Sequence, residues 1–287
     1  MHSDPIRFDQ LSVVVPVYNE GPSVRSIVLR ALALGDGIEV VVVNDASSDN
    51  TAAELQGLPI RLINHARNLG YGASLKSGIL AASRDTVITI DADGEHAPED
   101  ALRLLAVFKE GAMVSGCRKA GIDRGFVKCV GKMILWGVAS FASSVRIPDI
   151  NSGLRVFSRK MVVPFFRFFP DTFSFQTTST LSVLLSRGQI IYVPINFFPR
   201  VGTSKVMLKD GFISLWYILG LFARMRLLRF CVFMAIIVIG ISAMAAILMA
   251  SSLWVKLSWA VGMMALGLVL EVASRDRLAG AQVTVKD

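Results

Sequence analysis

The amino-acid sequence predicts an α/β domain with a mostly parallel sheet, followed by amphipathic helices and a C-terminal hairpin of two transmembrane helices. Three observations lead to this fold class. Runs rich in Val and Ile alternate with helical stretches over the first 110 residues. Hydrophobic residues make up 53% of the 287 residues and charged residues only 18%, whereas about a quarter of an ordinary soluble domain is charged. The 21 residues of segment 230–250 include no charged side chain.

Four short apolar runs in the first 110 residues predict strands, at residues 11–18, 38–44, 60–64 and 86–90. The stretches between them have helical composition, at residues 23–34, 48–56 and 73–83. Strands rich in Val and Ile that alternate with helices are typical of a parallel sheet covered on both faces. We therefore expect a Rossmann-like domain in this part of the chain.

Acidic residues directly follow three of these runs, at Glu20, Asp45 and the pair Asp91 and Asp93. Ligands of open α/β sheets bind beyond the carboxyl ends of the strands, so we expect the carboxylates to converge on one crevice. Asp91, Asp93 and the nearby Glu95 can offer oxygens to a hard cation such as Mg²⁺ or Mn²⁺. The alternative is a set of solvated loop acids with a helix-capping role. Five acids between residues 91 and 100 would repel one another without a cation, which favours the metal site.

The two parts of the chain carry opposite net charges. Residues 1–110 carry 9 Lys/Arg and 15 Asp/Glu, a net charge of −6, whereas residues 111–287 carry 21 and 7, a net charge of +14. The basic part is expected to contact lipid headgroups or phosphates. Nucleic acid is excluded as a partner because this part is hydrophobic and has no aromatic-plus-basic RNA motif. The chain also has no P-loop sequence and no complete dinucleotide-binding glycine motif.

The C-terminal part predicts a transmembrane hairpin over residues 230–273. Segment 230–250 is long enough, at about 1.5 Å per residue, to cross a hydrocarbon core of about 30 Å. In segment 253–273, Lys256 and Glu271 lie near the ends, where long side chains reach the interface. Basic residues flank the hairpin on both sides, so the positive-inside rule predicts both ends, the domain and the 274–287 tail, in the cytoplasm. The alternative, a buried pair of core helices, is disfavoured by the length of the first segment.

Two further segments, at about 126–146 and at 207–229, mix Lys and Arg with Trp and Phe. This pattern is typical of a helix that lies in the headgroup plane of a membrane. Core helices of the domain are the alternative for each segment taken alone. Because both segments accompany a transmembrane hairpin, we expect interfacial helices.

The ordered set of motifs resembles the family-2 glycosyltransferases with the GT-A fold, and most closely the polyprenyl-phosphate and dolichol-phosphate sugar synthases. The matching segments are 14–20 (VVPVYNE), 44–51 (NDASSDNT), 67–73 (RNLGYGA), 91–96 (DADGEH), 116–118 (GCR), 149–155 (DINSGLR) and 200–205 (RVGTSK). Each motif alone is unspecific, but together they follow the family order over residues 11–205. The resemblance implies a GT-A domain over residues 1–206.

The resemblance also implies roles for individual residues. The base and ribose of a nucleotide sugar would be lined by Pro16, Tyr18, Glu20 and Asp45, with Asp91 beside them. The metal and its diphosphate would be held by Asp91, Asp93 and Glu95. The acceptor phosphate would be surrounded by Arg118, Lys128, Arg200 and Lys205. Three features depart from the family pattern: Glu95 replaces a Gln, Ala46 replaces a Gly, and the helical stretch 172–187 has Gln176, Thr177 and Thr178 where many relatives carry a carboxylate.

The expected function is transfer of one sugar from a UDP- or GDP-sugar to a polyprenyl phosphate at the cytoplasmic membrane face, dependent on Mg²⁺ or Mn²⁺. A lipid phosphate is already an anion at neutral pH, so it needs little help from a general base. Asp93 and Asp149 are the catalytic candidates; Asp149 either orients the acceptor or only caps the turn that follows it. A homo-oligomer is compatible with the sequence.

Three alternatives to this function stay open. The first is a transferase for another lipid acceptor, of the diacylglycerol or ceramide type, whose hydroxyl would need a true base. The second is a nucleotidyltransferase on a similar sheet. The third is a membrane-anchored scaffold that binds a nucleotide sugar without catalysis, although the intact Asp91-x-Asp93 motif argues against it.

Overall fold

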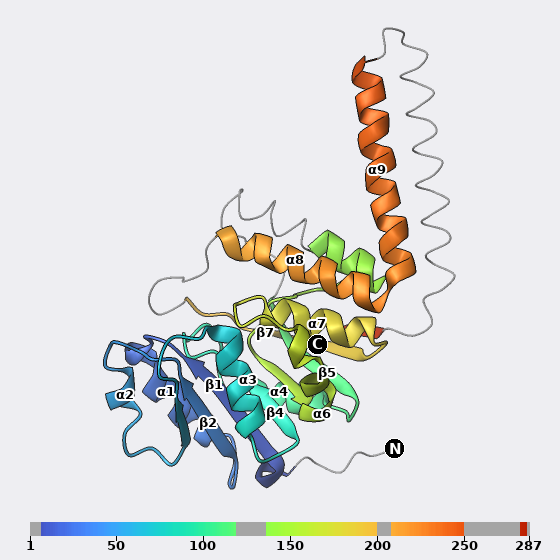
Figure 1. Cartoon of the computed structure of the whole chain (residues 1–287). Coiled ribbons are helices and arrows are strands. Elements are labelled where there is room, and N and C mark those ends of the chain that lie inside the picture. Colours follow the sequence, from blue (N-terminus) through green and yellow to red (C-terminus); the bar gives the residue numbers. More distant parts are fainter. Residues whose placement is uncertain (1–6, 119–135, 200–207, 250–281, 286–287) are drawn as a thin grey trace.

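The computed structural model describes residues 7–118, 136–199, 208–249 and 282–285 (Figure 1). An α/β domain carries one long helix that projects away from it, and a second helix lies across the domain at the base of this projection (Figure 1). The mostly parallel sheet expected from the sequence is confirmed.

The sheet has eight strands in the order β3-β2-β1-β4-β6-β5-β7-β8. Their bounds are β1 Leu11–Val17, β2 Glu39–Asn44, β3 Arg61–Asn64, β4 Thr86–Thr89, β5 Ala112–Arg118, β6 Arg155–Ser158, β7 Gln189–Ile195 and β8 Gln282–Val285. β6 runs antiparallel to both β4 and β5, and every other pairing is parallel. The carboxyl ends of β1, β2, β4, β5 and β7 therefore share one edge with the amino end of β6.

Successive side chains of a strand point to opposite faces of the sheet, and here both faces are hydrophobic. Helices therefore cover both faces and form one core on each. On one face, Val13 and Val15 of β1 pack with α1 (Gly21–Leu32) and α4 (Asp100–Val107). On the other face, Val14 packs with α3 (Tyr71–Ala81) and α7 (Phe175–Leu185). A Cβ on Gly78 of α3 would lie 2.4 Å from Val14 Cγ1, so the missing side chain lets α3 approach the sheet closely. The remaining short elements are η1 (Phe8–Gln10), α2 (Thr51–Glu54), α6 (Arg159–Val162) and η2 (Val163–Phe168).

The C-terminal helices leave the domain from the α7 face. α8 (Leu208–Met225) packs on α7, with Ile218, Leu221 and Phe222 buried in the core that α7 shares. α9 (Leu227–Met249) then extends away from the domain (Figure 1). Within the described part of the chain, α9 is the helix long and apolar enough to cross a membrane: its span 227–245 has a mean hydropathy of 2.4 and is 6% buried.

Three predictions about the membrane segments and the C-terminal tail have different outcomes in the structure. The first predicted span, 230–250, coincides with α9 over residues 230–249, and α9 begins three residues earlier, at Leu227. The second, 253–273, lies outside the described residues. The 274–287 segment is not only a tail, because its residues 282–285 form β8 beside β7. The alternation Gln-Val-Thr-Val in this strand, with two β-branched valines, suits a sheet edge.

The predicted interfacial helix at 126–146 is described only from residue 136 onward. Residues 136–143 are helical, and Ala139 and Ala142 are fully buried against the domain. The Trp136 indole donates a hydrogen bond to the Ile147 carbonyl. Phe141 is 41% exposed and contacts Phe233 of α9. This described part therefore lies between the domain core and the base of α9.

Candidate active site

The loops after β1 and β2 interlock into one frame at the carboxyl edge. The Asn19 amide donates to Ser47 Oγ at 2.9 Å, and Asn19 Oδ1 accepts the Ser48 amide at 2.7 Å. The Glu20 amide donates to Thr51 Oγ1 at 3.0 Å. Pro16, Tyr18 and Glu20, the residues expected to line a nucleotide, lie at the end of β1 and in the loop that this frame holds.

Asp45 is buried and organises the next loop rather than facing solvent. Its Oδ1 lies 2.7 Å from His65 Nδ1 and accepts the Leu69 amide at 2.8 Å, while Oδ2 accepts the Gly70 amide at 2.8 Å. The role expected for Asp45, contact with a base or ribose, is thus accompanied by a structural role that the sequence did not indicate.

The amino end of α3 is occupied by the protein's own backbone. The Asp171 carbonyl accepts the Gly72 amide at 2.9 Å and the Ala73 amide at 3.3 Å. A Cβ on Gly70, whose φ is +103°, would lie 2.3 Å from the Asp171 oxygen. This loop contact takes the position that a dinucleotide-binding helix gives to a pyrophosphate, in agreement with the incomplete glycine motif.

Asp91 follows β4 and is held from two sides. Tyr71 Oη donates to Asp91 Oδ1 at 2.7 Å, and Gln176 Nε2 donates to Tyr71 Oη at 2.8 Å. A Cβ on Gly153 would lie 1.9 Å from Asp91 Oδ2, so the carboxylate rests against the glycine backbone. Burial, aided by the Asp91 charge, raises the pKa of Tyr71 well above its usual value, which keeps the hydroxyl protonated as a donor.

The loop that holds Asp93 and Glu95 is tied to both neighbouring layers. Asp93 is buried, and its Oδ1 accepts the Glu95 amide at 3.0 Å. Ser23 Oγ of α1 donates to the Ala92 carbonyl at 2.6 Å. On the other side, the Phe198 amide donates to the Glu95 carbonyl at 3.0 Å. The loop is therefore fixed between α1 and the chain that follows β7.

His96 is buried in the same loop beside Phe197, with ring centroids 4.7 Å apart. Neither ring nitrogen has a hydrogen-bond partner among the described residues. Burial lowers the pKa of His96 below its usual value, so the ring is neutral near pH 7. It packs against the site as an apolar group, which fits a structural role.

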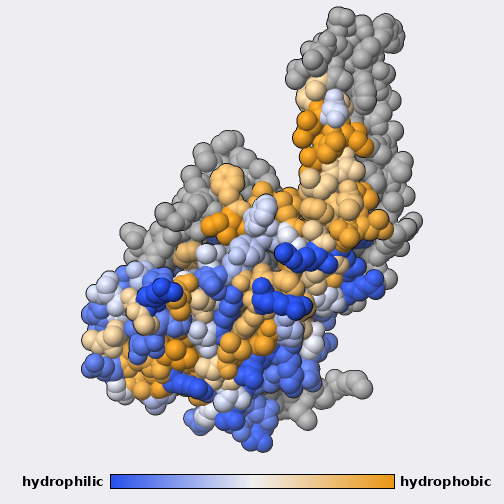
Figure 2. Space-filling model, viewed as in Figure 1, coloured by the Kyte–Doolittle hydropathy of each residue, from blue (hydrophilic) through white to orange (hydrophobic). Residues whose placement is uncertain are grey.

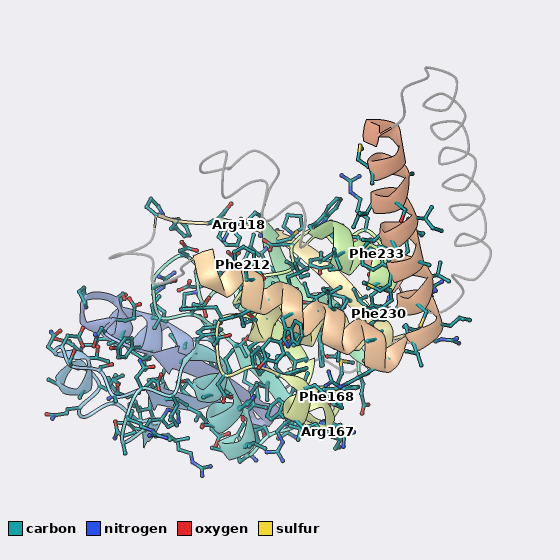
Figure 3. The ribbon with its side chains drawn as sticks, turned by 45° about the horizontal axis from the view of Figure 1, so that its top comes forward. Arg118, Arg167, Phe168, Phe212, Phe230 and Phe233 are labelled. Carbon is teal, nitrogen blue, oxygen red and sulfur yellow. The ribbon has the colours of Figure 1, made fainter. Side chains whose placement is uncertain are left out.

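Arg118 at the end of β5 links the carboxylates of the predicted donor and acceptor sides. Its Nη2 lies 3.7 Å from Glu95 Oε2, and its Nε lies 3.9 Å from Asp149 Oδ2. The guanidinium lies over the Phe197 ring, 4.7 Å from its centroid (Arg118 is labelled in Figure 3). The other predicted acceptor cations, Lys128, Arg200 and Lys205, lie outside the described residues.

Asp149 caps the turn that follows it and also faces Arg118. Its Oδ1 accepts the Asn151 amide at 3.0 Å, which caps the turn, while Oδ2 faces Arg118. The turn is held from below by the fully buried Arg155, which donates to the carbonyls of Ile150 at 3.0 Å and Ser152 at 2.8 Å.

The carboxylates fit a divalent cation that arrives with its substrate. Among the described residues, no three His, Cys, Asp or Glu side chains are grouped closely enough to hold a metal ion. One oxygen of Asp91 is engaged by Tyr71 and one of Glu95 by Arg118, so Asp91, Asp93 and Glu95 stay the expected protein ligands. Mg²⁺ is usually bound by one or two carboxylates together with substrate phosphates. Carboxylate oxygens beside the expected position of the diphosphate match that pattern.

A separate cavity of about 610 Å³ lies between α1 and α2, lined among others by Arg25, Arg30 and Glu54. None of the predicted site residues lines it. The chemistry indicated by the sequence therefore belongs to the carboxyl edge and not to this cavity.

Comparisons with known proteins agree with this geometry. The family model described as Glycosyl transferase family 2 matches residues 12–169. The undecaprenyl-phosphate 4-deoxy-4-formamido-L-arabinose transferase of Proteus mirabilis (strain HI4320) is 33% identical over 167 residues, 54% of this chain and 51% of that protein. The enzyme of the same name from Serratia proteamaculans (strain 568) is 31% identical over 169 residues, 55% of this chain and 51% of that protein. The chain matches only about half the length of these curated relatives.

Solved structures match the fold. Glucosyl-3-phosphoglycerate synthase from Mycobacterium tuberculosis in complex with UDP has a TM-score of 0.57 and 17% identity, over 74% of this chain and 80% of that chain. The same enzyme with Mn²⁺, UDP and phosphoglyceric acid has a TM-score of 0.58 and 20% identity, over 75% and 78% of the two chains. At these identities the likeness establishes the architecture of the domain.

Proposed function

The chain belongs to glycosyl transferase family 2, and on this premise we propose that it moves a single sugar from a nucleotide diphosphate sugar to a polyprenyl phosphate. The names of the undecaprenyl-phosphate transferases support the acceptor class. The UDP and Mn²⁺ in the titles of the structural neighbours support a nucleotide-sugar donor and a divalent cation.

The observation that carries the proposal is the position of Arg118. Its guanidinium lies within 4 Å of carboxylate oxygens from both sides of the site, Glu95 and Asp149. A guanidinium presents several N–H donors in a fork that suits phosphate oxygens. A lipid phosphate bound there would lie beside the acidic loop where the donor diphosphate is expected.

The transfer reaction mainly requires that the negative charges of the two substrates are offset and that the substrates are oriented. The acceptor phosphate is already an anion, so the nucleophile needs no deprotonation near pH 7. Arg118 offsets the repulsion between this phosphate and the donor diphosphate, while Asp149 and the Phe197 ring orient the guanidinium. A divalent cation held by Asp93 and Glu95 would supply positive charge to the leaving diphosphate. Pro16, Tyr18, Glu20, Asp45 and Asp91 are the proposed donor contacts.

The C-terminal helices support a position of this site at the membrane surface. Phe212 and Trp216, one turn apart on α8, are each 77% exposed, opposite the residues that pack on α7. The hydrophobic surface of α8 continues along α9 (Figure 2), and Phe230 and Phe233 lie at its base (Figure 3). Aromatic and apolar side chains on an amphipathic helix are typical of the headgroup boundary.

Arginines gather directly beneath this apolar surface. Arg167 and Arg224 both lie against the Phe168 ring, at 4.6 and 5.9 Å from its centroid. Arg226 donates to the Leu185 carbonyl at 3.0 Å. Positive side chains at this level favour the cytoplasmic, anionic face of a membrane. We place the catalytic domain there, at headgroup height, so that the acceptor phosphate enters while its chain stays in lipid.

β8 supports a multi-pass topology. The chain leaves the domain in α9 and is again beside the domain at β8, where residues 282–285 pair with β7. If α9 crosses the membrane, the residues before and after the membrane segment then lie on the same side. We therefore propose that the C-terminal residues lie in the cytoplasm with the domain.

The test is transfer by the purified full chain. We expect sugar transfer to undecaprenyl phosphate from one of a panel of UDP- and GDP-sugars with Mg²⁺ or Mn²⁺. Asp93→Ala should abolish transfer with the fold intact, and Asp36→Ala, an exposed acid far from the site, should not. Full activity of Asp93→Ala would contradict the metal assignment. Transfer only to a diacylglycerol or ceramide would contradict the acceptor, and pyrophosphate as a product would indicate a nucleotidyltransferase.

A further inference from the structure

Two consecutive residues at the start of α7, Gln176 and Thr177, each reach one of the site carboxylates through a second residue. We propose that Gln176 is a positioning residue for Asp91 on the donor side and Thr177 a positioning residue for Asp149 on the acceptor side. This inference rests on the proposed function, because it assigns the two carboxylates to the two substrates.

On the donor side, the relay runs from Gln176 through Tyr71 to Asp91. Tyr71 Oη uses its proton to donate to Asp91 Oδ1 at 2.7 Å, so it can only accept from residue 176. The Gln176 amide supplies that N–H at 2.8 Å, whereas an ionised carboxylate has no proton to donate. The ring of Tyr71 is also stacked on Phe173, with centroids 5.3 Å apart. Glutamine therefore suits this Tyr-Asp pair better than a carboxylate would.

On the acceptor side, the relay runs from Thr177 through Asn151 to Asp149. Thr177 Oγ1 donates to the side-chain Oδ1 of Asn151 at 2.6 Å, and the backbone N–H of Asn151 donates to Asp149 Oδ1 at 3.0 Å. Thr177 is buried, whereas Asn151 is exposed, so the threonine anchors a loop that otherwise borders solvent. With Oδ1 held in this way, Asp149 Oδ2 is left facing Arg118.

The start of α7 is itself held in place from two directions. The buried Arg155 donates to the Gln176 carbonyl at 3.0 Å, and to the turn that contains Asn151 through the Ile150 and Ser152 carbonyls. Ser174 Oγ lies 2.7 Å from Ser214 Oγ of α8. A shift of α7 would therefore disturb both relays, whereas loss of one side chain should disturb only one. This difference allows a selective test.

The experiment compares Gln176→Leu and Thr177→Val with the control Thr178→Val in the full chain, and adds Gln176→Glu and Thr177→Ser. Thr178 is also buried, but among the described residues its hydroxyl donates to the Ser174 and Phe175 carbonyls of the α7 region and to neither relay. Dissociation constants are measured by calorimetry for the nucleoside diphosphate with Mn²⁺ and for farnesyl phosphate. KM values for both substrates are measured in parallel, and thermal unfolding reports whether each variant folds.

We expect Gln176→Leu to weaken donor binding by about 5- to 10-fold, within the range of one hydrogen bond between uncharged groups, with acceptor binding changed less than about twofold. Gln176→Glu should weaken donor binding further, because two acceptors then meet at Tyr71 Oη. Thr177→Val should raise the acceptor constants by a similar factor and spare the donor constants. Thr177→Ser, which keeps the hydroxyl, should restore them, and Thr178→Val should leave both sets unchanged.

Equal losses for donor and acceptor in either variant would overturn the assignment, as would a Thr178→Val effect equal to that of Thr177→Val. Wild-type protein that binds both ligands but transfers no sugar would contradict the proposed function and leave the relays supported by the binding data. Wild-type protein that binds neither ligand would contradict both.

Discussion

Gly153 determines where the Asp91 carboxylate can lie. The glycine precedes β6 and has no positive φ, so its backbone conformation is open to other residues. Its Cα is nevertheless covered by Asp91, since a Cβ there would lie 1.9 Å from Oδ2 and 2.4 Å from Cγ. The absence of a side chain, rather than backbone freedom, is what this position contributes to the site.

We therefore predict that Gly153→Ala displaces Asp91 from Tyr71 and weakens nucleotide-sugar binding by about tenfold, close to the effect of a lost hydrogen bond to a charge. The measurement is calorimetric titration with the nucleoside diphosphate and Mn²⁺. Gly137→Ala is the matched control, because a Cβ at that position meets nothing within 4 Å. Unchanged binding by Gly153→Ala would show that the Asp91 position is not needed.

Two buried groups that ionise at alkaline pH, the Cys117 thiol and the Tyr192 hydroxyl, determine how we expect stability to depend on pH. Burial raises the pKa of the Cys117 thiol to about 11, with a smaller effect from Asp149, and burial also raises the pKa of Tyr192 above its usual value. Above about pH 9 the unfolded chain loses protons that the native chain keeps. Stability is therefore fully present below that pH and falls as the pH rises.

The second prediction is that the thermal unfolding temperature of the wild type decreases between pH 9 and pH 11, and decreases less steeply in Cys117→Ala. Cys231→Ala is the control, since Cys231 is exposed on α9. Identical slopes for wild type and Cys117→Ala would rule out the buried thiol as a cause of the alkaline loss.

Sequence reasoning locates the acids of the site but not the residues that hold them. Asp91 and Asp93 are predictable because they follow a recognisable strand. Tyr71 and Gln176 are not, because they lie 105 positions apart and meet only when α3 and α7 pack on the same face. Phe197 is missed for a similar reason: its role arises from Arg118 and His96 in other loops.

At the scale of elements, α8 has two different sides. Ile218, Leu221 and Phe222 are buried against the domain, whereas Phe212 and Trp216 face outward. The sequence predicts an amphipathic helix here. The structure shows in addition that the inner side of this helix is buried in the core of the domain. The exposed aromatic face is then the part available to lipid.

The third prediction concerns this face. Phe212→Gln combined with Trp216→Gln should reduce transfer to undecaprenyl phosphate in bilayers by about tenfold, because α9 still anchors the domain and only a fraction of the roughly 1.5–3 kcal/mol that burial of each ring contributes is lost. Transfer to soluble farnesyl phosphate should stay within twofold. Leu80→Gln is the control, because Leu80 is 58% exposed on α3, on the domain. Equal losses with both acceptors would refute a membrane role for this face.

Strands β1 to β4 lie where the sequence predicts them, because Val-rich runs bounded by polar loops are strong local signals. β6 is different. Its four residues lie between β4 and β5 and run antiparallel to both, and no local pattern distinguishes such an insertion from another parallel strand. β8 is also unpredicted, since a four-residue strand after an apolar stretch depends wholly on the β7 edge for its pairing.

At the scale of the whole molecule, the acidic and basic parts of the chain meet at one edge of the sheet. The acids Asp93 and Glu95 come from the first part, and Arg118 comes from the second. The contact of Arg118 with Glu95 is one place where the acidic part, of net charge −6, meets the basic part, of net charge +14. Composition alone indicates the opposite charges but not that they are adjacent.

The pairing of β8 with the domain restricts how the chain can cross a membrane. Its register with β7, from Gln189 opposite Gln282 to Tyr192 opposite Val285, covers an edge that would otherwise present unpaired backbone groups. Because the pairing is with the catalytic sheet itself, these C-terminal residues must lie on the same side of the membrane as the active site.

The last prediction tests that requirement. Val285 is 51% exposed, so Val285→Cys in a chain without the three native cysteines should react with a membrane-impermeant maleimide only when the cytoplasmic face is accessible. Ser83→Cys, exposed on the domain, should label with the same sidedness and serves as the control. If Val285→Cys instead labels from the opposite face, β8 cannot pair with β7 in the membrane-bound protein. An odd number of crossings would then replace the hairpin, because a strand cannot join a sheet from which a bilayer separates it.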